Sequence, residues 1–159
     1  MSVEKIISGG QTGADRGGLD AALFLGLSHG GACPAGRRAE DGRIPERYHL
    51  EETPERDYAV RTERNVLAAD ATVLFTYGEP TGGSALTASL TRRHGRPLLH
   101  VDLSRNDERW AGRFIDFCAE HGVRVLNVAG SRESGAPGLQ RRVQFFLVAA
   151  LGGRLGASG

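Results

Sequence analysis

EKIISGGQTGADRGG, residues 4–18, is the stretch that decides the fold. Its first part, Glu4–Ser8, is apolar at its centre and predicts a strand, and the turn Gly9–Gly18 follows at once. Beyond the turn, an amphipathic stripe predicts a helix, with apolar or small residues at positions 19, 22, 23, 26 and 27. A strand that enters a helix through glycines gathers backbone N–H groups at the helix N-terminus, where an anion is stabilised.

The same alternation of strand and helix continues along the chain. We expect further strands at Ser28–Cys33, Ala71–Thr76, Pro97–Val101 and Val123–Asn127. We expect a helix with Thr53 as its N-cap and Pro54 as its first residue, and three more, ending near Gly95, at Gly122 and at Ala150. Five strands alternating with helices predict an α/β fold, a Rossmann-like three-layer α/β/α sandwich with a five-stranded, mainly parallel sheet. Residues 1–151 are expected to form one ligand-binding domain, and 152–159 a flexible tail.

The amino-acid composition limits the classes of molecule that the protein is expected to bind. The 159 residues suit one domain, and a formal net charge of +1 without blocks of like charge argues against binding nucleic acid or a membrane surface. The N-terminus has no long apolar segment after a basic one, so a cytoplasmic location is expected. Cys33 and Cys118 lie far apart and do not have the spacing of metal ligands, so no metal site is expected.

The first glycine-rich turn is the leading candidate for ligand binding. It is neither a GxGxxG motif nor a Walker A loop, which argues against hydride chemistry and ATP hydrolysis. A purely structural turn is the alternative, but polar donors and a carboxylate cluster within it. The candidate residues here are Gly9, Gly10, Gln11, Thr12, Gly13, Ala14, Asp15 and Arg16.

A second glycine turn is predicted at the end of the third strand, where ligands of open α/β sheets bind. Its candidate residues are Thr81, Gly82, Gly83, Ser84 and Thr87, and an ordinary N-cap at Ser84 is the alternative. The two turns would flank one crevice directly if the first and third strands are neighbours, as in the flavodoxin-like order. A third loop adds Asn127 and Gly130, with Arg132 nearby, and the helix before the third strand adds Arg61 and Asn65. The alternative for the third loop is a plain surface loop, and the alternative for Arg61 and Asn65 is a solvated helix face.

The long polar segment after the second strand is the predicted lid. Connections of this length are more often functional than idle. We expect Cys33–Tyr48 to close over the ligand, with Arg37 and Arg38 as its cationic clamp.

Five blocks of this sequence resemble the molybdenum-cofactor carrier family: GGQTGADRGGLDAAL, CPAGRRAEDGRIPERY, RTERNV, TGGSALT and RVLNVAGSRES. The resemblance runs from about Ile6 to Leu151, and it implies that the ligand is molybdenum cofactor (molybdopterin), or otherwise a nucleotide. The family is related to Rossmann-like lysine-decarboxylase-like phosphoribohydrolases and to sensors of nucleotide messengers. Those hydrolases carry a PGGxGTxxE turn, whereas Ala88 and Ser89 stand here where their catalytic glutamate would be.

The sequence thus favours a carrier that binds an anionic small molecule and acts as a homo-oligomer. The alternatives are an enzyme that cleaves the N-glycosidic bond of a nucleotide with Asp15, Asp41 or Glu79, and a nucleotide-messenger sensor. Asp15 is the residue we would assign to catalysis if turnover occurs. Because breaking this bond needs a placed carboxylate to stabilise positive charge on the ribose, losing the helix-borne acid argues against turnover.

Overall fold

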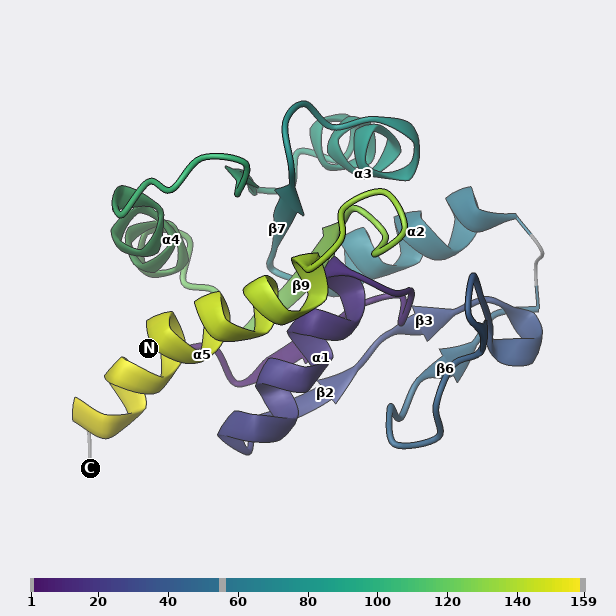
Figure 1. The fold of residues 1–159 in the computed structure, drawn as a ribbon, viewed down its shortest axis with the longest axis horizontal. Coiled ribbons are helices and arrows are strands. Elements are labelled where there is room, and N and C mark those ends of the chain that lie inside the picture. Colours follow the sequence, from purple (N-terminus) through teal and green to yellow (C-terminus); the bar gives the residue numbers. More distant parts are fainter. Residues whose placement is uncertain (1, 55–56, 158–159) are drawn as a thin grey trace.

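The computed structural model describes residues 2–54 and 57–157. Its centre is a five-stranded sheet in the order β2-β1-β9-β7-β8, in which every pair is parallel (Figure 1). The strands are β1 (Lys5–Ile7), β2 (Ser28–Gly30), β7 (Ala71–Thr76), β8 (Leu98–Asp102) and β9 (Val125–Gly130). This arrangement confirms the predicted α/β class and the parallel sheet.

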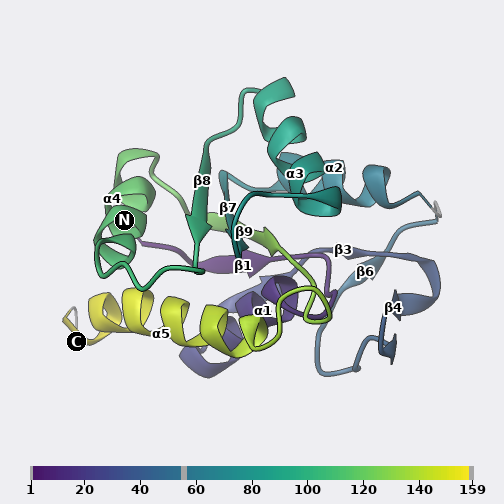
Figure 2. The ribbon, with the colours of Figure 1, turned by 45° about the horizontal axis from the view of Figure 1, so that its top comes forward.

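Helices cover both faces of the sheet. On one face lie α1 (Ala14–Leu25) and α5 (Leu139–Ala157), and on the other lie α2 (Tyr58–Ala68) and α3 (Gly82–Arg93), as Figures 1 and 2 show. The remaining helix, α4 (Arg109–Glu120), packs beside α5. The sheet between them is apolar, and all six residues of β7 are buried, as expected of a parallel strand covered on both sides.

The segment after β2 forms a small subsidiary structure rather than an irregular loop. β3 (Ala32–Cys33) pairs with β6 (Glu51–Glu52), the 3-10 turn η1 spans Ala35–Arg37, and β4 (Arg38–Ala39) forms a hairpin with β5 (Gly42–Arg43). The expected strand Ser28–Cys33 is therefore split at Gly31. That residue has φ +124°, and a Cβ there would stand 2.0 Å from the carbonyl oxygen of Ser8.

The first and third strands, β1 and β7, are not neighbours, so this sheet does not have the flavodoxin-like order that would place the two glycine turns side by side. β9 lies between β1 and β7 and pairs with both, in a register that sets Leu126 beside Ile6 and Ala71. The hydrophobic pattern made each strand recognisable, but it could not order them, because any of these apolar strands fits the sheet interior.

Two helix ends also differ from the prediction. Thr53 is not an N-cap, because its N–H and hydroxyl both donate to the Cys33 carbonyl, at 2.9 and 3.2 Å. The N-cap of α2 is Asp57, whose carboxylate accepts from Ala59 N at 2.8 Å. At the other end of the chain, α5 continues to Ala157, well into the segment expected to be a tail, and residues 158–159 lie outside the described part.

Glycines set how closely α1 packs. A Cβ on Gly17 would lie 2.5 Å from the backbone oxygen of Gln140 in α5, and one on Gly18 would lie 2.7 Å from the Val128 side chain in β9. The N-terminal end of α1 is therefore held tightly against the sheet and α5, which fixes the turn that precedes it.

We expect Gly17→Ala to destabilise the fold by about 1–3 kcal/mol, because the added methyl meets a backbone atom that cannot move alone. In α4, a Cβ on Gly112 meets nothing within 4 Å, so Gly112→Ala should raise the free energy of unfolding by about 0.5–1 kcal/mol. Urea titrations of both variants give the comparison. Equal effects of the same sign would show that helix propensity, not packing, decides both positions.

Candidate functional site

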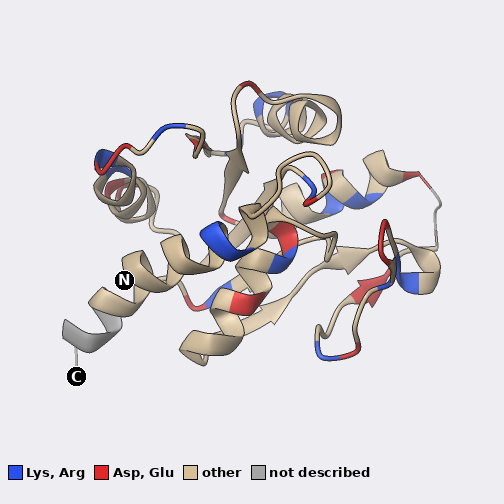
Figure 3. Ribbon diagram, viewed as in Figure 1, with Lys and Arg blue, Asp and Glu red and all other residues tan. Residues whose placement is uncertain are grey.

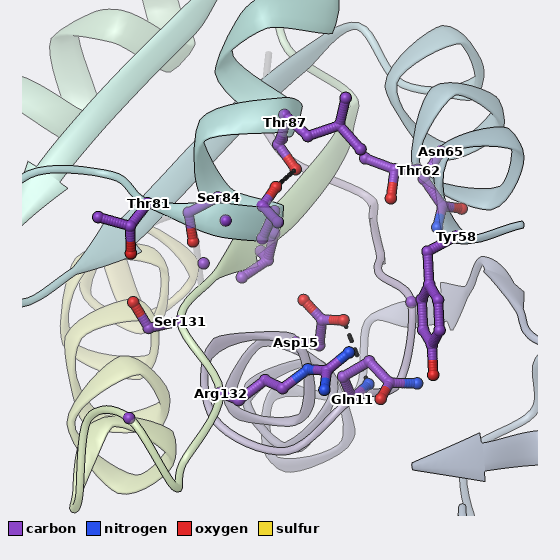
Figure 4. A pocket seen from close by; sticks show the side chains of 18 of the residues that line it. Gln11, Asp15, Tyr58, Thr62, Asn65, Thr81, Ser84, Thr87, Ser131 and Arg132 are labelled. Atoms are coloured by element: carbon purple, nitrogen blue, oxygen red, sulfur yellow. Dashed lines mark hydrogen bonds between the residues drawn. The ribbon is translucent and has the colours of Figure 1, made fainter. Parts of the chain in front are cut away.

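A cavity of about 630 Å³ opens at the carboxyl edge of the sheet. Its base is formed by the segments that follow β1, β7 and β9, and its walls by α2, the start of α3 and the loop between β9 and α5 (Figure 4). Both glycine turns line it, although their strands are not neighbours, because the β9 loop lies between them. The predicted shared crevice therefore exists, with the third loop at its centre.

The first glycine turn uses most of its N–H groups inside the protein. Gly10 N donates to Ser8 Oγ at 3.3 Å and Gln11 N to Asp15 Oδ2 at 3.2 Å. Gly13 N lies 3.4 Å from Gln140 Oε1, and Ala14 N donates to the Ser131 carbonyl at 3.1 Å. These donors fix the turn against α1, α5 and the β9 loop, so they are not free for an anion.

The second glycine turn has free donors. Thr81 is the N-cap of α3, and its carbonyl accepts from the N–H groups of Ser84 and Ala85. Within the described part of the chain, the N–H groups of Gly82 and Gly83 have no acceptor, and both residues are exposed. Since the N-terminus of a helix carries a partial positive charge, these two groups are suited to hold an anion at the cavity wall.

Arg61 is a buried cation without a protein acceptor. Only 9% of the residue is exposed, and its guanidinium makes no hydrogen bond or ion pair with any residue that the structure describes. The guanidinium lies directly over the backbone of Gly9, where a Cβ would stand 1.6 Å from Arg61 Nη1. Its central carbon lies 5.3 Å from the centroid of the Tyr58 ring. Any side chain at position 9 would displace it.

Arg132 brings a second guanidinium to the same wall. It follows β9, is exposed, and its guanidinium carbon lies 5.4 Å from the Tyr58 ring centroid. Its loop is attached to the β4–β5 hairpin, because Ser134 Oγ donates to Glu40 Oε2 at 2.5 Å and Thr12 Oγ1 donates to Glu40 Oε1. In Figure 3, the basic segments of α2 and of this loop lie near the acidic start of α1.

Asp15 is the acidic group within this basic setting. Its side chain points into the cavity in Figure 4, and it is 8% exposed. Burial raises the pKa of Asp15 to about 6, although Arg61, the Gln11 N–H, Arg132 and Arg16 all act in the opposite direction. The carboxyl therefore changes its charge near neutral pH.

The structure brings together twelve of the predicted residues. Lining the cavity are Gly9, Gln11, Asp15, Arg61, Asn65, Thr81, Gly82, Gly83, Ser84, Thr87, Asn127 and Gly130. Two of them have structural roles as well: Asn65 exchanges hydrogen bonds with both backbone groups of Ala32, and Asn127 donates to Thr72 Oγ1. Ser131 also lines the cavity; it lies in the third loop that the sequence had indicated, although it was not among the candidate residues. Sequence reasoning missed Tyr58 and Tyr77, since nothing in the sequence indicates which aromatic groups reach this edge.

The other predicted residues do not line the cavity: Gly10, Thr12, Gly13, Ala14, Arg16, Arg37 and Arg38. Arg16 is buried and forms a paired hydrogen bond with Asp41 at 2.6 and 2.8 Å. Arg37 is buried as well, and its guanidinium donates to the carbonyls of Ile44, Pro45 and Tyr48. Arg38 is exposed and its carbonyl accepts from Gln11 Nε2. Arg37 thus holds the 33–48 segment together from inside, and closure of that segment over a ligand stays a prediction.

No group of three or more His, Cys, Asp or Glu side chains within residues 2–54 and 57–157 could hold a metal ion. None of the helices in that part has the length and apolar character to cross a bilayer.

This architecture is similar to that of known proteins. The model of the circularly permutated YpsA SLOG family matches residues 6–151. The crystal structure of a "putative molybdenum carrier protein" from Syntrophus aciditrophicus SB is similar to this chain, with a TM-score of 0.90 and 42% sequence identity over 94% of this chain and 95% of that one. No curated protein matches the chain. The family match includes the whole cavity lining and, apart from Lys5 at the start of β1, all strands of the central sheet.

The raised pKa of Asp15 predicts a pH-dependent stability. A carboxyl that holds its proton more strongly when folded destabilises the fold as it ionises, so this cost is absent below pH 4 and complete above pH 7. Asp15→Asn should therefore stabilise the protein at pH 7.5, by on the order of 1–3 kcal/mol, and the gain should shrink toward pH 4.

Asp102 provides a control, because its replacement should change the stability in the opposite direction. Hydrogen bonds from Ser104 and the Gly78 N–H lower its pKa to about 2, so its ionised form stabilises the fold at neutral pH. Asp102→Asn should be destabilising at pH 7.5. Urea unfolding at several pH values measures both, and a pH-independent effect of Asp15→Asn would show that this carboxyl does not titrate near pH 6.

Proposed function

This chain belongs to the circularly permutated YpsA SLOG family, and we propose that it binds an anionic, phosphorylated small molecule in the cavity at the carboxyl edge of its sheet. The proposed ligand is molybdenum cofactor, which the protein would shelter and pass on, and a nucleotide is the second candidate. The protein would then act as a binding or carrier protein rather than an enzyme.

The observation that carries the proposal is the state of Arg61. Burying a guanidinium without an acceptor costs several kcal/mol, and proteins avoid it unless a partner is supplied. Here 91% of the residue is removed from solvent, and no carboxylate or carbonyl of the described chain accepts from it. A ligand anion is the partner that this position lacks, and a planar guanidinium fork is well suited to bind phosphate.

The surroundings supply the remaining contacts that an anion needs. The free N–H groups of Gly82 and Gly83 and the hydroxyl of Ser84 stand at the start of α3, and Arg132 adds a second positive charge. Cavities of this size usually take small organic ligands. The two tyrosines, Tyr58 and Tyr77, offer flat apolar surface for the non-phosphate part of the ligand.

The choice of molybdenum cofactor over a nucleotide is supported by the name given to the similar protein, a molybdenum carrier. In such a complex the phosphate would be held by Arg61, Arg132 and the start of α3. The pterin would then lie toward Tyr58 and Asp15. A nucleotide presents the same combination of phosphate and flat heterocycle, so it fits the same groups.

Replacing Arg61 should weaken the binding of a phosphate-bearing probe. We expect Arg61→Gln to reduce the affinity for GMP by roughly 10- to 100-fold, the loss typical of a hydrogen bond to a charged group. Arg64→Gln is the matched control, because Arg64 lies on the same helix but is exposed and paired with Glu51 at 2.8 Å. Isothermal titration calorimetry with both variants measures the difference. Equal affinities of Arg61→Gln and wild type would refute the site.

Enzymatic turnover is the second candidate function, and the cavity-facing carboxyl of Asp15 is the observation that favours it. We expect no release of free base when the protein is incubated with a panel of nucleoside monophosphates, because Ala88 and Ser89 stand where the related hydrolases carry their helix-borne catalytic acid. Chromatography of the products gives the answer. Base release that Asp15→Asn abolishes would overturn the carrier assignment in favour of an N-glycosidase.

A further inference from the structure

We propose that Asp15 is the specificity-determining residue of this cavity, and that its carboxylate recognises two adjacent N–H donors on the edge of the ligand's heterocycle. The chemical class is a 2-amino-4-oxopyrimidine ring, whose ring N–H and amino group stand side by side. Guanine and pterin share this edge. The inference rests on the proposed function, since it concerns the part of the same ligand that lies away from the phosphate.

The carboxylate of Asp15 has acceptor capacity that the protein does not use. Oδ2 accepts one hydrogen bond, from Gln11 N at 3.2 Å, and among the described residues no donor to Oδ1 is found. An ionised carboxylate offers about four acceptor sites, so most remain available. A carboxylate that is 8% exposed and faces a cavity with unused acceptors requires donors from whatever occupies that cavity.

The charges around Asp15 limit the kind of hydrogen-bond donor that a ligand can present to its carboxylate. Arg61 and Arg132 face Asp15 from α2 and from the β9 loop, and Arg16 stands one residue further along α1. The other acidic residue of the lining, Glu79, is exposed at the cavity rim. A ligand ammonium would be repelled by Arg61 and Arg132, since Arg16 is paired with Asp41, whereas neutral N–H groups can approach the carboxylate without that cost.

The shape of the site favours a flat donor edge. Two carboxylate oxygens match two parallel N–H groups in a bidentate pair, the geometry by which carboxylates and guanidinium groups recognise each other. In Figure 4, the Asp15 carboxyl points into the open space and the Tyr58 ring stands at the side of that space. A heterocycle whose donor edge meets Asp15 would therefore have an aromatic ring beside it. A ribose diol is the competing donor pair, and the experiment below separates the two.

The test compares probes that differ by one group. GMP and IMP carry the same phosphate and ribose, but IMP lacks the 2-amino group, and ribose 5-phosphate lacks the base altogether. We expect the wild-type protein to bind GMP at least about 10-fold more tightly than IMP, the loss expected for one hydrogen bond to a charged group. Asp15→Asn should bring the two affinities together. Binding of ribose 5-phosphate should be unchanged in Asp15→Asn, because this probe lacks the donor edge that the carboxylate is proposed to recognise.

The pH dependence of binding separates ligand recognition from a purely structural role of Asp15, because a structural role would leave the ratio of GMP to IMP affinity unchanged. The protonated carboxyl offers one donor in place of an acceptor, so the ratio of GMP to IMP affinity should fall toward one as the pH is lowered from 7.5 to 5. Because both probes carry the same phosphate, titration of that phosphate cancels in the ratio. Circular dichroism and thermal unfolding of Asp15→Asn control for folding, and Asp15→Glu provides a second variant that keeps the charge but displaces the carboxylate.

The possible outcomes distinguish a failure of the Asp15 inference from a failure of the proposed function. Equal wild-type affinities for GMP and IMP, with binding that still depends on Arg61, would refute the role of Asp15 and leave the proposed function intact. A loss in Asp15→Asn that is as large for ribose 5-phosphate as for GMP would assign the carboxylate to the sugar instead. Failure of all probes to bind would overturn the proposed function together with this inference. A phosphorylated pterin tested alongside GMP shows which of the two sources of the edge is preferred.

Discussion

The carboxyl edge of the sheet depends on backbone contacts that leave no room for a Cβ atom. At Gly13 a Cβ would stand 2.2 Å from the Ser131 carbonyl, and at Gly130 it would stand 2.0 Å from the Phe75 carbonyl. At Gly9 the space that a side chain would fill is taken by the Arg61 guanidinium. These contacts bring the ends of β1, β7 and β9 close enough to form one base for a single cavity, and they explain why its turns are rich in glycine.

The same close packing creates an electrostatic imbalance. Arg61 is desolvated without an acceptor, while Asp15, a few ångströms away, is desolvated with only one donor. The Arg61 charge acts on Asp15 and lowers its pKa, but burial has the larger effect, so the two groups do not compensate each other fully. Such unpaired groups destabilise the free protein, and they provide a favourable interaction for a ligand that carries both an anion and hydrogen-bond donors. Under the proposed function, the loss of stability in the free protein would be recovered when the ligand binds.

The contrast between the two glycine turns shows where motif reasoning reached its limit. The first turn has the more conspicuous sequence, yet its N–H groups bind Ser8, Asp15, Ser131 and Gln140, residues from three separate segments. The shorter turn at 81–84 keeps its donors free. Likewise, Arg37 and Arg38 look like a clamp in the sequence, but Arg37 donates to carbonyls of its own segment. Whether a donor is free depends on all of its neighbours, and local sequence specifies only the nearest of them.

The sequence by itself determined the α/β class, the five strands and most helix ends, because these follow from hydrophobic periodicity and from glycine and proline signals that act over a few residues. It also identified twelve of the residues that line the cavity, since carboxyl ends of parallel strands meet at one edge. Only the tertiary structure decided that β9 lies between β1 and β7, that Asp57 rather than Thr53 caps α2, and that Tyr58 and Arg61 line the same cavity as Asp15. Those features arise from contacts between segments far apart in the chain, where burial and the competition for hydrogen-bond partners decide the outcome.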